Sequence, residues 1–122
     1  MPRYVILEHT GTPTYKPGRH WDLMLESDGR LRTWELEATP SHGVQVRALP
    51  LEDHRLDYLD YEGPVSKNRG TVGRWDAGEY QAISETEGEL TVQVHGQQLR
   101  GRLHLQRDSA DSGIWWVSFE PG

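Results

Sequence analysis

The sequence predicts an all-β fold, mostly antiparallel, which we expect to close into a compact β-barrel with one short helix. Apolar and polar residues alternate along most of the chain, and this period of two is typical of half-buried strands. Short turns that contain glycine separate these segments. Only 34% of the 122 residues are hydrophobic, which fits a small core lined by alternate residues with a polar opposite face.

Tight turns join three pairs of expected strands. Ser27-Asp28-Gly29 joins the first pair, Asp76-Ala77-Gly78 the second, and a turn that contains Gly96 the third. Together with three single strands, these pairs give about nine strands. The expected strands are residues 4–7, 20–26, 30–36, 44–49, 70–75, 79–83, 90–95, 99–106 and 114–119.

One segment does not follow the alternation. Residues 52–59 suit a helical turn or a short helix. Glu52 and Asp53 lead the segment, and acidic side chains are favoured at the positive N-terminal end of a helix dipole. The sequence therefore predicts one short helix among the strands.

The composition excludes several classes of protein. With no cysteine, the chain has neither disulfides nor zinc sites built on thiolates. No apolar run approaches the ~18 residues of a membrane span, and the first residues lack the apolar stretch of a signal peptide. We therefore expect a cytoplasmic protein without a membrane partner, made of a single domain over residues 1–122, and a monomer. The net charge of −6 argues against nonspecific coating of nucleic acid but leaves room for a local basic cleft.

The motif His20-Trp21-Asp22-Leu23-Met24-Leu25 is the sharpest local signal. On a strand, His20 and Asp22 point to one face while the apolar residues between them point to the other. An imidazole beside a carboxylate suits a divalent cation such as manganese, zinc or iron. His9, at the end of the first expected strand, is the candidate third ligand. The alternative interpretation is a surface ion pair between His20 and Asp22.

A second signal is the spacing of four between His54 and Tyr58, which would place both on one face of a helix. An imidazole and a phenol together can bind or protonate a phosphate oxygen. Glu52 is a candidate to orient His54 through a hydrogen bond. The alternative is a structural turn whose tyrosine packs on the barrel. Lys67 and Arg69 lie in a loop flanked by glycines, from which basic side chains can reach a phosphate.

Taken together, these motifs resemble the 3′-phosphoesterase domain of bacterial ligase D, which occurs fused to a ligase and a polymerase and also as a separate protein. The block Glu52-Asp53-His54-Arg55-Leu56-Asp57-Tyr58, followed by Glu62-Gly63, is the most specific part. The resemblance covers most of the chain, through residues 5–9, 20–29, 33–34, 40–41, 52–63, 70–72, 75–80 and 95–102.

The resemblance implies a β-barrel with a crescent-shaped cleft and a manganese-dependent activity that trims 3′ ends by removing a terminal ribonucleoside and then a 3′-phosphate. The metal-binding positions of the family match His9, His20 and Asp22. The family's phosphate-contacting His and Tyr match His54 and Tyr58, and its supporting Glu matches Glu52.

Three basic positions of the family are not kept. Met24, Ala38 and Val46 stand where the family has Arg, Lys and Arg. Arg47 lies one residue out of register, and on a strand such a step turns a side chain to the other face. Fixed charges at a developing charge are commonly the largest catalytic contribution. The candidates to replace the missing cations are Lys67, Arg69, Arg47 and Arg19.

Three functions follow as hypotheses. The first is a manganese-dependent 3′-phosphoesterase in DNA repair by non-homologous end joining, which acts on DNA 3′ ends or a primer-template beside a separate ligase and polymerase. The second is a weakened or inactive metal-binding module that docks nucleic-acid ends or a repair partner. The third, a small-molecule metalloenzyme of the cupin type, lacks its usual His-x-His spacing.

Overall fold

The computed structural model describes residues 1–122, which form nine strands and one 3-10 helix. Every pair of neighbouring strands is antiparallel, and the expected all-β class is confirmed. The elements are β1 (Arg3–Thr12), β2 (Tyr15–Ser27), β3 (Arg30–Leu36), β4 (Val46–His54), η1 (Leu56–Leu59), β5 (Gly63–Pro64), β6 (Thr71–Thr86), β7 (Glu89–Gly96), β8 (Arg100–Arg107) and β9 (Trp115–Pro121).

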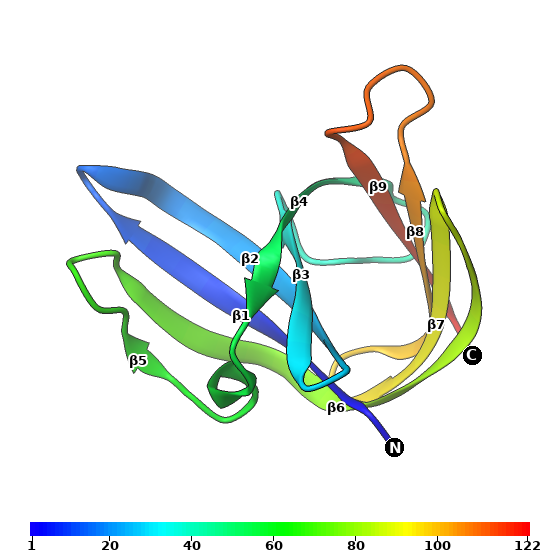
Figure 1. The fold of residues 1–122 in the computed structure, drawn as a ribbon, viewed down its shortest axis with the longest axis horizontal. Coiled ribbons are helices and arrows are strands. Elements are labelled where there is room, and N and C mark those ends of the chain that lie inside the picture. Colours follow the sequence, from blue (N-terminus) through cyan, green and yellow to red (C-terminus); the bar gives the residue numbers. More distant parts are fainter.

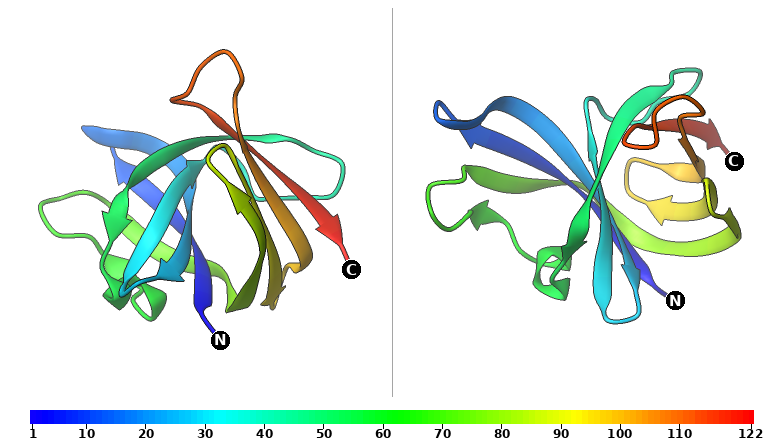
Figure 2. Two further views of the ribbon diagram at one scale, coloured as in Figure 1. Left: turned by 45° about the vertical axis from the view of Figure 1, so that its right-hand side comes forward. Right: turned by 45° about the horizontal axis from the view of Figure 1, so that its top comes forward.

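The sheet closes on itself into a barrel (Figures 1 and 2). The strand order is β1-β2-β3-β4-β9-β8-β7-β6, and β6 pairs with β1 to complete the ring. The short strand β5 pairs only with the start of β6. At one end the β1–β2 hairpin extends outward, and the loop after β5 lies on the same side of the molecule. No helix in the structure has the length and apolar character needed to span a membrane.

The barrel interior holds the larger of two apolar clusters. It draws buried residues from eight strands, among them Ile6, Leu23, Val92 and Leu103. These residues alternate with outward-facing ones, as the strand pleat requires. Trp34 lies in this cluster and is 4% exposed, while Trp75 packs against it and is partly buried. The interior therefore follows the alternation seen in the sequence.

The expectation of a polar opposite face is wrong for β1 and β2. Val5 and Leu7 of β1, together with Met24 of β2, point away from the interior and are at most 1% exposed. They form a second apolar cluster with Leu59 of η1 and Val72 of β6. The segment from η1 to β5 covers this part of the barrel, because burying these apolar side chains removes their surface from water.

The turn expected at Asp76-Ala77-Gly78 is also wrong, because β6 runs through it and reverses only at residues 87–88. The carboxylate of Asp76 accepts hydrogen bonds from the backbone N–H groups of Gln97 (2.7 Å) and Gln98 (2.8 Å). A Cβ atom on Gly78 would lie 2.0 Å from the carbonyl oxygen of His95. These residues therefore serve the contact between β6 and the β7–β8 turn, although their types are those of a hairpin turn.

The helix expected over residues 52–59 is present only as η1, residues Leu56–Leu59. The strand β4 continues to His54, which pairs with Leu31 of β3. Cross-strand pairing thus outweighs the local acidic pattern at Glu52 and Asp53. His54 lies on a strand, and the spacing of four does not describe its relation to Tyr58.

Candidate metal centre and the cleft around it

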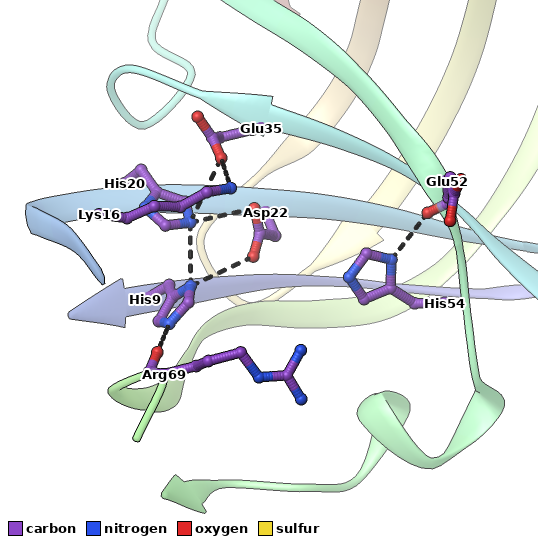
Figure 3. Close-up of polar contacts among 8 residues, drawn as sticks. All are labelled: His9, Lys16, His20, Asp22, Glu35, Glu52, His54 and Arg69. Atoms are coloured by element: carbon purple, nitrogen blue, oxygen red, sulfur yellow. Dashed lines mark hydrogen bonds and ion pairs between the residues drawn. The ribbon is translucent and has the colours of Figure 1, made fainter. Parts of the chain in front are cut away.

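The antiparallel register of β1 and β2 brings His9 and His20 directly opposite each other. Nδ1 of His9 lies 3.0 Å from Nε2 of His20. Nδ1 of His9 is 4.0 Å from Oδ2 of Asp22, and Nε2 of His20 is 3.5 Å from Oδ1 of the same carboxylate. One ligand atom from each of the three residues lies within 4.8 Å of the others, and Figure 3 shows the three side chains converging. We call His9, His20 and Asp22 the trio.

The trio lies on the face of β1 and β2 that carries the second apolar cluster, and it is largely shielded from solvent. His9 is 8% exposed and Asp22 is 5% exposed. Oδ1 of Asp22 is buried and has no hydrogen-bond partner. A buried carboxylate oxygen without a partner is costly, and a bound cation would satisfy it.

The hydrogen bond made by Nε2 of His9 fixes the tautomer of its imidazole ring. Nε2 lies 2.6 Å from the backbone carbonyl oxygen of Arg69. Since a carbonyl oxygen only accepts, Nε2 carries the hydrogen, and Nδ1 of the neutral ring turns a lone pair toward His20 and Asp22. A histidine that binds a metal commonly donates its other N–H to a carbonyl in this way. Two imidazoles and a carboxylate fit a divalent cation such as manganese, zinc or iron.

A carboxylate and a lysine that the sequence interpretation missed lie beside the trio. Glu35 of β3 pairs in register with Asp22, and its Oε1 lies 3.7 Å from Nε2 of His20. The same oxygen accepts a hydrogen bond of 2.8 Å from Nζ of Lys16. Burial alone would lower the pKa of Lys16, but the hydrogen bond and charge of Glu35 outweigh it, and the pKa is raised. Extending the register of the β2–β3 hairpin from its turn places Glu35 opposite Asp22, and this was the signal in the sequence that could have found Glu35.

His54 and Tyr58 come together although they lie on different elements. Their rings meet edge to face, with centroids 5.6 Å apart. Nδ1 of His54 donates to the backbone carbonyl oxygen of Glu52 at 2.9 Å. Glu52 therefore contacts His54 through its main chain, whereas the sequence interpretation assigned the orienting hydrogen bond to this residue without saying which atom makes it. The bond leaves Nε2 of His54 as the nitrogen available to a ligand.

A cleft of about 170 Å³ joins these groups, since the trio, His54 and Tyr58 all line it. Lys16 and Arg69 are the basic residues of its wall, and Met24 contributes to its apolar part. The guanidinium of Arg69 is folded back on Ser66, with Nε 2.9 Å from the carbonyl oxygen and Nη2 3.0 Å from Oγ.

Three of the cations named as replacements do not line the cleft. Arg47 is paired with Glu37 at 3.0 Å, and Arg19 lies 3.6 Å from Glu8. Lys67 stands in the turn before Arg69 with a φ of 62°, in the left-handed region. Of the residues expected to bind substrate, only Arg69 borders the trio.

A wider pocket of about 420 Å³ adjoins the cleft and shares Tyr58 and Val65 with it. Tyr61 lines this pocket and is 38% exposed. Its ring meets that of Tyr58 at 90°, with centroids 6.1 Å apart. Arg55 and Asp57 are the charged residues that line the wider pocket. The two hollows thus lie side by side, the trio lining the smaller one and Tyr61 the wider one.

Comparisons with known proteins agree on one family. The sequence model of the DNA Ligase D 3′-phosphoesterase domain family matches residues 11–107. The multifunctional non-homologous end joining protein LigD of Pseudomonas aeruginosa is 32% identical over 115 residues, which cover 86% of this chain and 13% of that protein. The LigD of Mycobacterium tuberculosis is 32% identical over 117 residues, 88% of this chain and 15% of that protein. The chain therefore spans about one seventh of the length of these relatives.

Proposed function

Because the chain belongs to the DNA ligase D 3′-phosphoesterase domain family, we propose that it is a metal-dependent phosphoesterase that acts on DNA 3′ ends. The reaction is the removal of a 3′-phosphate or of a 3′-terminal ribonucleotide. The observation that carries the proposal is the convergence of the trio beside His54 and Tyr58 in one cleft. A site for a divalent cation next to two phosphate-binding side chains is what phosphoester hydrolysis needs.

The trio would hold the cation, and manganese is the ion that we propose. When bound, such an ion polarises a phosphoryl oxygen and lowers the pKa of a bound water. The neutral ring of His9 is kept in the right form by the carbonyl of Arg69. The second apolar cluster, on the same face of β1 and β2, fixes the positions of the trio, because Met24 and Leu7 are packed in it.

His54 and Tyr58 would act on the phosphate. The carbonyl oxygen of Glu52 keeps a hydrogen on Nδ1 of His54, so Nε2 points its lone pair, or in the imidazolium its N–H, at the ligand. The imidazolium form can donate a proton to the leaving oxygen, and the hydroxyl of Tyr58 can hydrogen-bond to a non-bridging oxygen. Arg69 would add positive charge at the wall of the cleft from its place against Ser66.

The wider pocket beside Tyr58 would hold the nucleoside that carries the phosphate. Aromatic side chains stack on bases of any sequence, which suits an activity on DNA ends without sequence preference. Tyr61 is the exposed ring of that pocket. The relatives are named for non-homologous end joining, and we place this chain in the same repair process, acting beside a ligase and a polymerase on a separate chain or on the same one.

The second candidate function is a module that binds metal and DNA ends without turnover. Met24, Ala38 and Val46 favour it, because these residues replace three cations of the family. Val46 is buried in the barrel interior and 3% exposed, and Met24 is buried in the second apolar cluster. Met24 lines the cleft without a charge, and Val46 does not line it.

The test is the release of phosphate from a primer-template with a 3′-phosphate, measured with Mn²⁺ and with EDTA. We expect release by the wild type only with the metal. His20→Ala should abolish release, while His104→Ala, outside the cleft, should retain it. Release by His20→Ala at the wild-type rate contradicts the proposal. Binding of the metal and of the DNA end without product in any divalent metal favours the module instead.

A further inference from the structure

The cleft is poor in positive charge at the place where a phosphate would bind. Lys16 is the only lysine and Arg69 the only arginine that line it, and the guanidinium of Arg69 is held by Ser66. A terminal phosphate carries close to two negative charges and needs cationic partners. A further cation beside the trio would therefore change what the site can bind.

Lys16 makes such an approach from the tip of the β1–β2 hairpin. It is the second residue of β2 and has a φ of 43°, in the left-handed region. In Figure 3 its side chain extends alongside His20, and its ammonium nitrogen ends at Glu35. Nζ of Lys16 lies 2.8 Å from Oε1 of Glu35, and that oxygen is 3.7 Å from Nε2 of His20. One carboxylate oxygen thus separates the ammonium group from the trio.

We propose that Lys16 is the phosphate-binding cation of this site and exchanges Glu35 for an oxygen of the terminal phosphate. The inference rests on the proposed function, since it concerns the substrate of the same cleft. It assigns to the hairpin tip the positive charge that Met24, Ala38 and Val46 do not supply. The ligand class is a 3′-terminal phosphomonoester or the phosphodiester before a 3′-terminal ribonucleoside.

Three physical features allow the exchange. The side chain of Lys16 is 41% exposed, and a partly exposed ion pair holds its partners only weakly. The lysine ammonium stands on a flexible four-carbon stem. A divalent cation in the trio would also repel the ammonium, which favours its movement to a phosphate that bears two charges.

The competing explanation is that Lys16 and Glu35 only pin the hairpin to β3. The two explanations predict opposite results for Glu35→Gln. If the pair is a structural pin, Glu35→Gln and Lys16→Ala damage the site in the same way. If Lys16 binds phosphate, Glu35→Gln releases the ammonium and keeps or strengthens phosphate binding.

The experiment measures the binding of two single-stranded oligonucleotides that differ only in a 3′-phosphate or a 3′-hydroxyl, by fluorescence anisotropy in EDTA and at several salt concentrations. For the wild type we expect about tenfold tighter binding of the 3′-phosphate end, which is the size of a charge-assisted contact. Lys16→Ala should remove this preference and reduce the slope of log K against log salt by about one. Lys16→Arg and Glu35→Gln should keep the preference.

Lys67→Ala is the matched control. It removes the other lysine of the chain, and Lys67 does not line the cleft. We expect it to keep the preference for the 3′-phosphate. The inference is overturned if the wild type shows no preference, if Lys16→Ala keeps it, or if Glu35→Gln loses it as Lys16→Ala does. A different result would contradict the proposed function alone: the wild type binds the 3′-phosphate through Lys16 but releases no phosphate with Mn²⁺.

Discussion

Nδ1 of His9 and Nε2 of His20 face each other at 3.0 Å across the β1–β2 ladder. The backbone carbonyl of Arg69 holds the other nitrogen of His9, so the two rings are fixed with their free nitrogens toward a buried carboxylate. Such a pair can share a hydrogen in the absence of metal and can bind a cation in its place.

Divalent metal should stabilise the folded protein through the trio. A ligand that binds only the folded state at 100 times its dissociation constant adds about 2.7 kcal/mol. We expect Mn²⁺ to raise the melting temperature of the wild type and of His104→Ala, and to leave that of His20→Ala unchanged. Differential scanning calorimetry with and without Mn²⁺ measures the effect. An equal rise in His20→Ala would place the metal elsewhere.

Tyr58→Phe should lower kcat for phosphate release by about 10², because loss of one hydrogen bond to a developing charge has an effect of this order. The ring stays, so its packing in the second apolar cluster is kept. Tyr80→Phe is the matched control: its hydroxyl donates to the carbonyl of Glu26 at 2.6 Å, outside the cleft. Steady-state kinetics of both variants check the prediction, and a kcat of Tyr58→Phe equal to that of the control would remove Tyr58 from the reaction.

Tyr61→Ala should raise KM by about tenfold and leave kcat nearly unchanged, because stacking on a base contributes about 1–3 kcal/mol. The substrate provides the control. On an oligonucleotide whose 3′-terminal nucleotide is abasic, wild type and variant should have the same KM. If the variant is equally impaired on both substrates, Tyr61 does not hold the base.

Asp76→Ala should destabilise the barrel by about 3 kcal/mol, because it leaves buried donors without an acceptor. Asp76 is 2% exposed and accepts from the Tyr4 hydroxyl and from the N–H groups of residues 97–99. Burial and the bond to Asp76 raise the pKa of Tyr4, so its hydroxyl remains a donor. Urea unfolding measures the loss. Asp53→Ala, on an exposed side chain, should change stability by less than about 0.5 kcal/mol.

Asp108 should make stability depend on pH in acid. The Trp116 indole N–H, followed by the N–H groups of Ala110 and Asp111, holds the pKa of Asp108 below its ordinary value of 3.8. A lowered folded-state pKa adds stability that is present above the ordinary value and is lost as the pH falls through the folded-state pKa. Asp108→Asn should therefore be less stable than the wild type at pH 7, by a difference that shrinks below about pH 4. A difference that is constant with pH contradicts this.

Most of the fold could be predicted from the sequence because alternation is a local property. The turn at Asp28 and Gly29 has φ values of 52° and 77°, as its residue types indicate. Asp76-Ala77-Gly78 has the same kind of composition, but its role depends on Tyr4 and on residues 97–99, which are distant in sequence. The acidic start of residues 52–59 likewise favours a helix locally, while the pairing of His54 with Leu31 extends the strand.

The candidate site could be predicted in part for the same reason. His20 and Asp22 share a face by their spacing, and the register then brings His9 opposite His20. Glu35 could have been found from the turn at residues 27–29, which sets the register of β2 with β3. Lys16 could not, since its position depends on the shape of the hairpin tip. The contact between His54 and Tyr58 was predicted, but from a helix over residues 52–59 of which only η1 is present.

The most direct test of the account is a crystal of the protein soaked in Mn²⁺ and examined by anomalous diffraction. We expect one strong anomalous peak at bonding distance from Nδ1 of His9, Nε2 of His20 and a carboxylate oxygen of Asp22. No peak at this position, with manganese bound elsewhere or not at all, would contradict the claim that the trio is the metal centre.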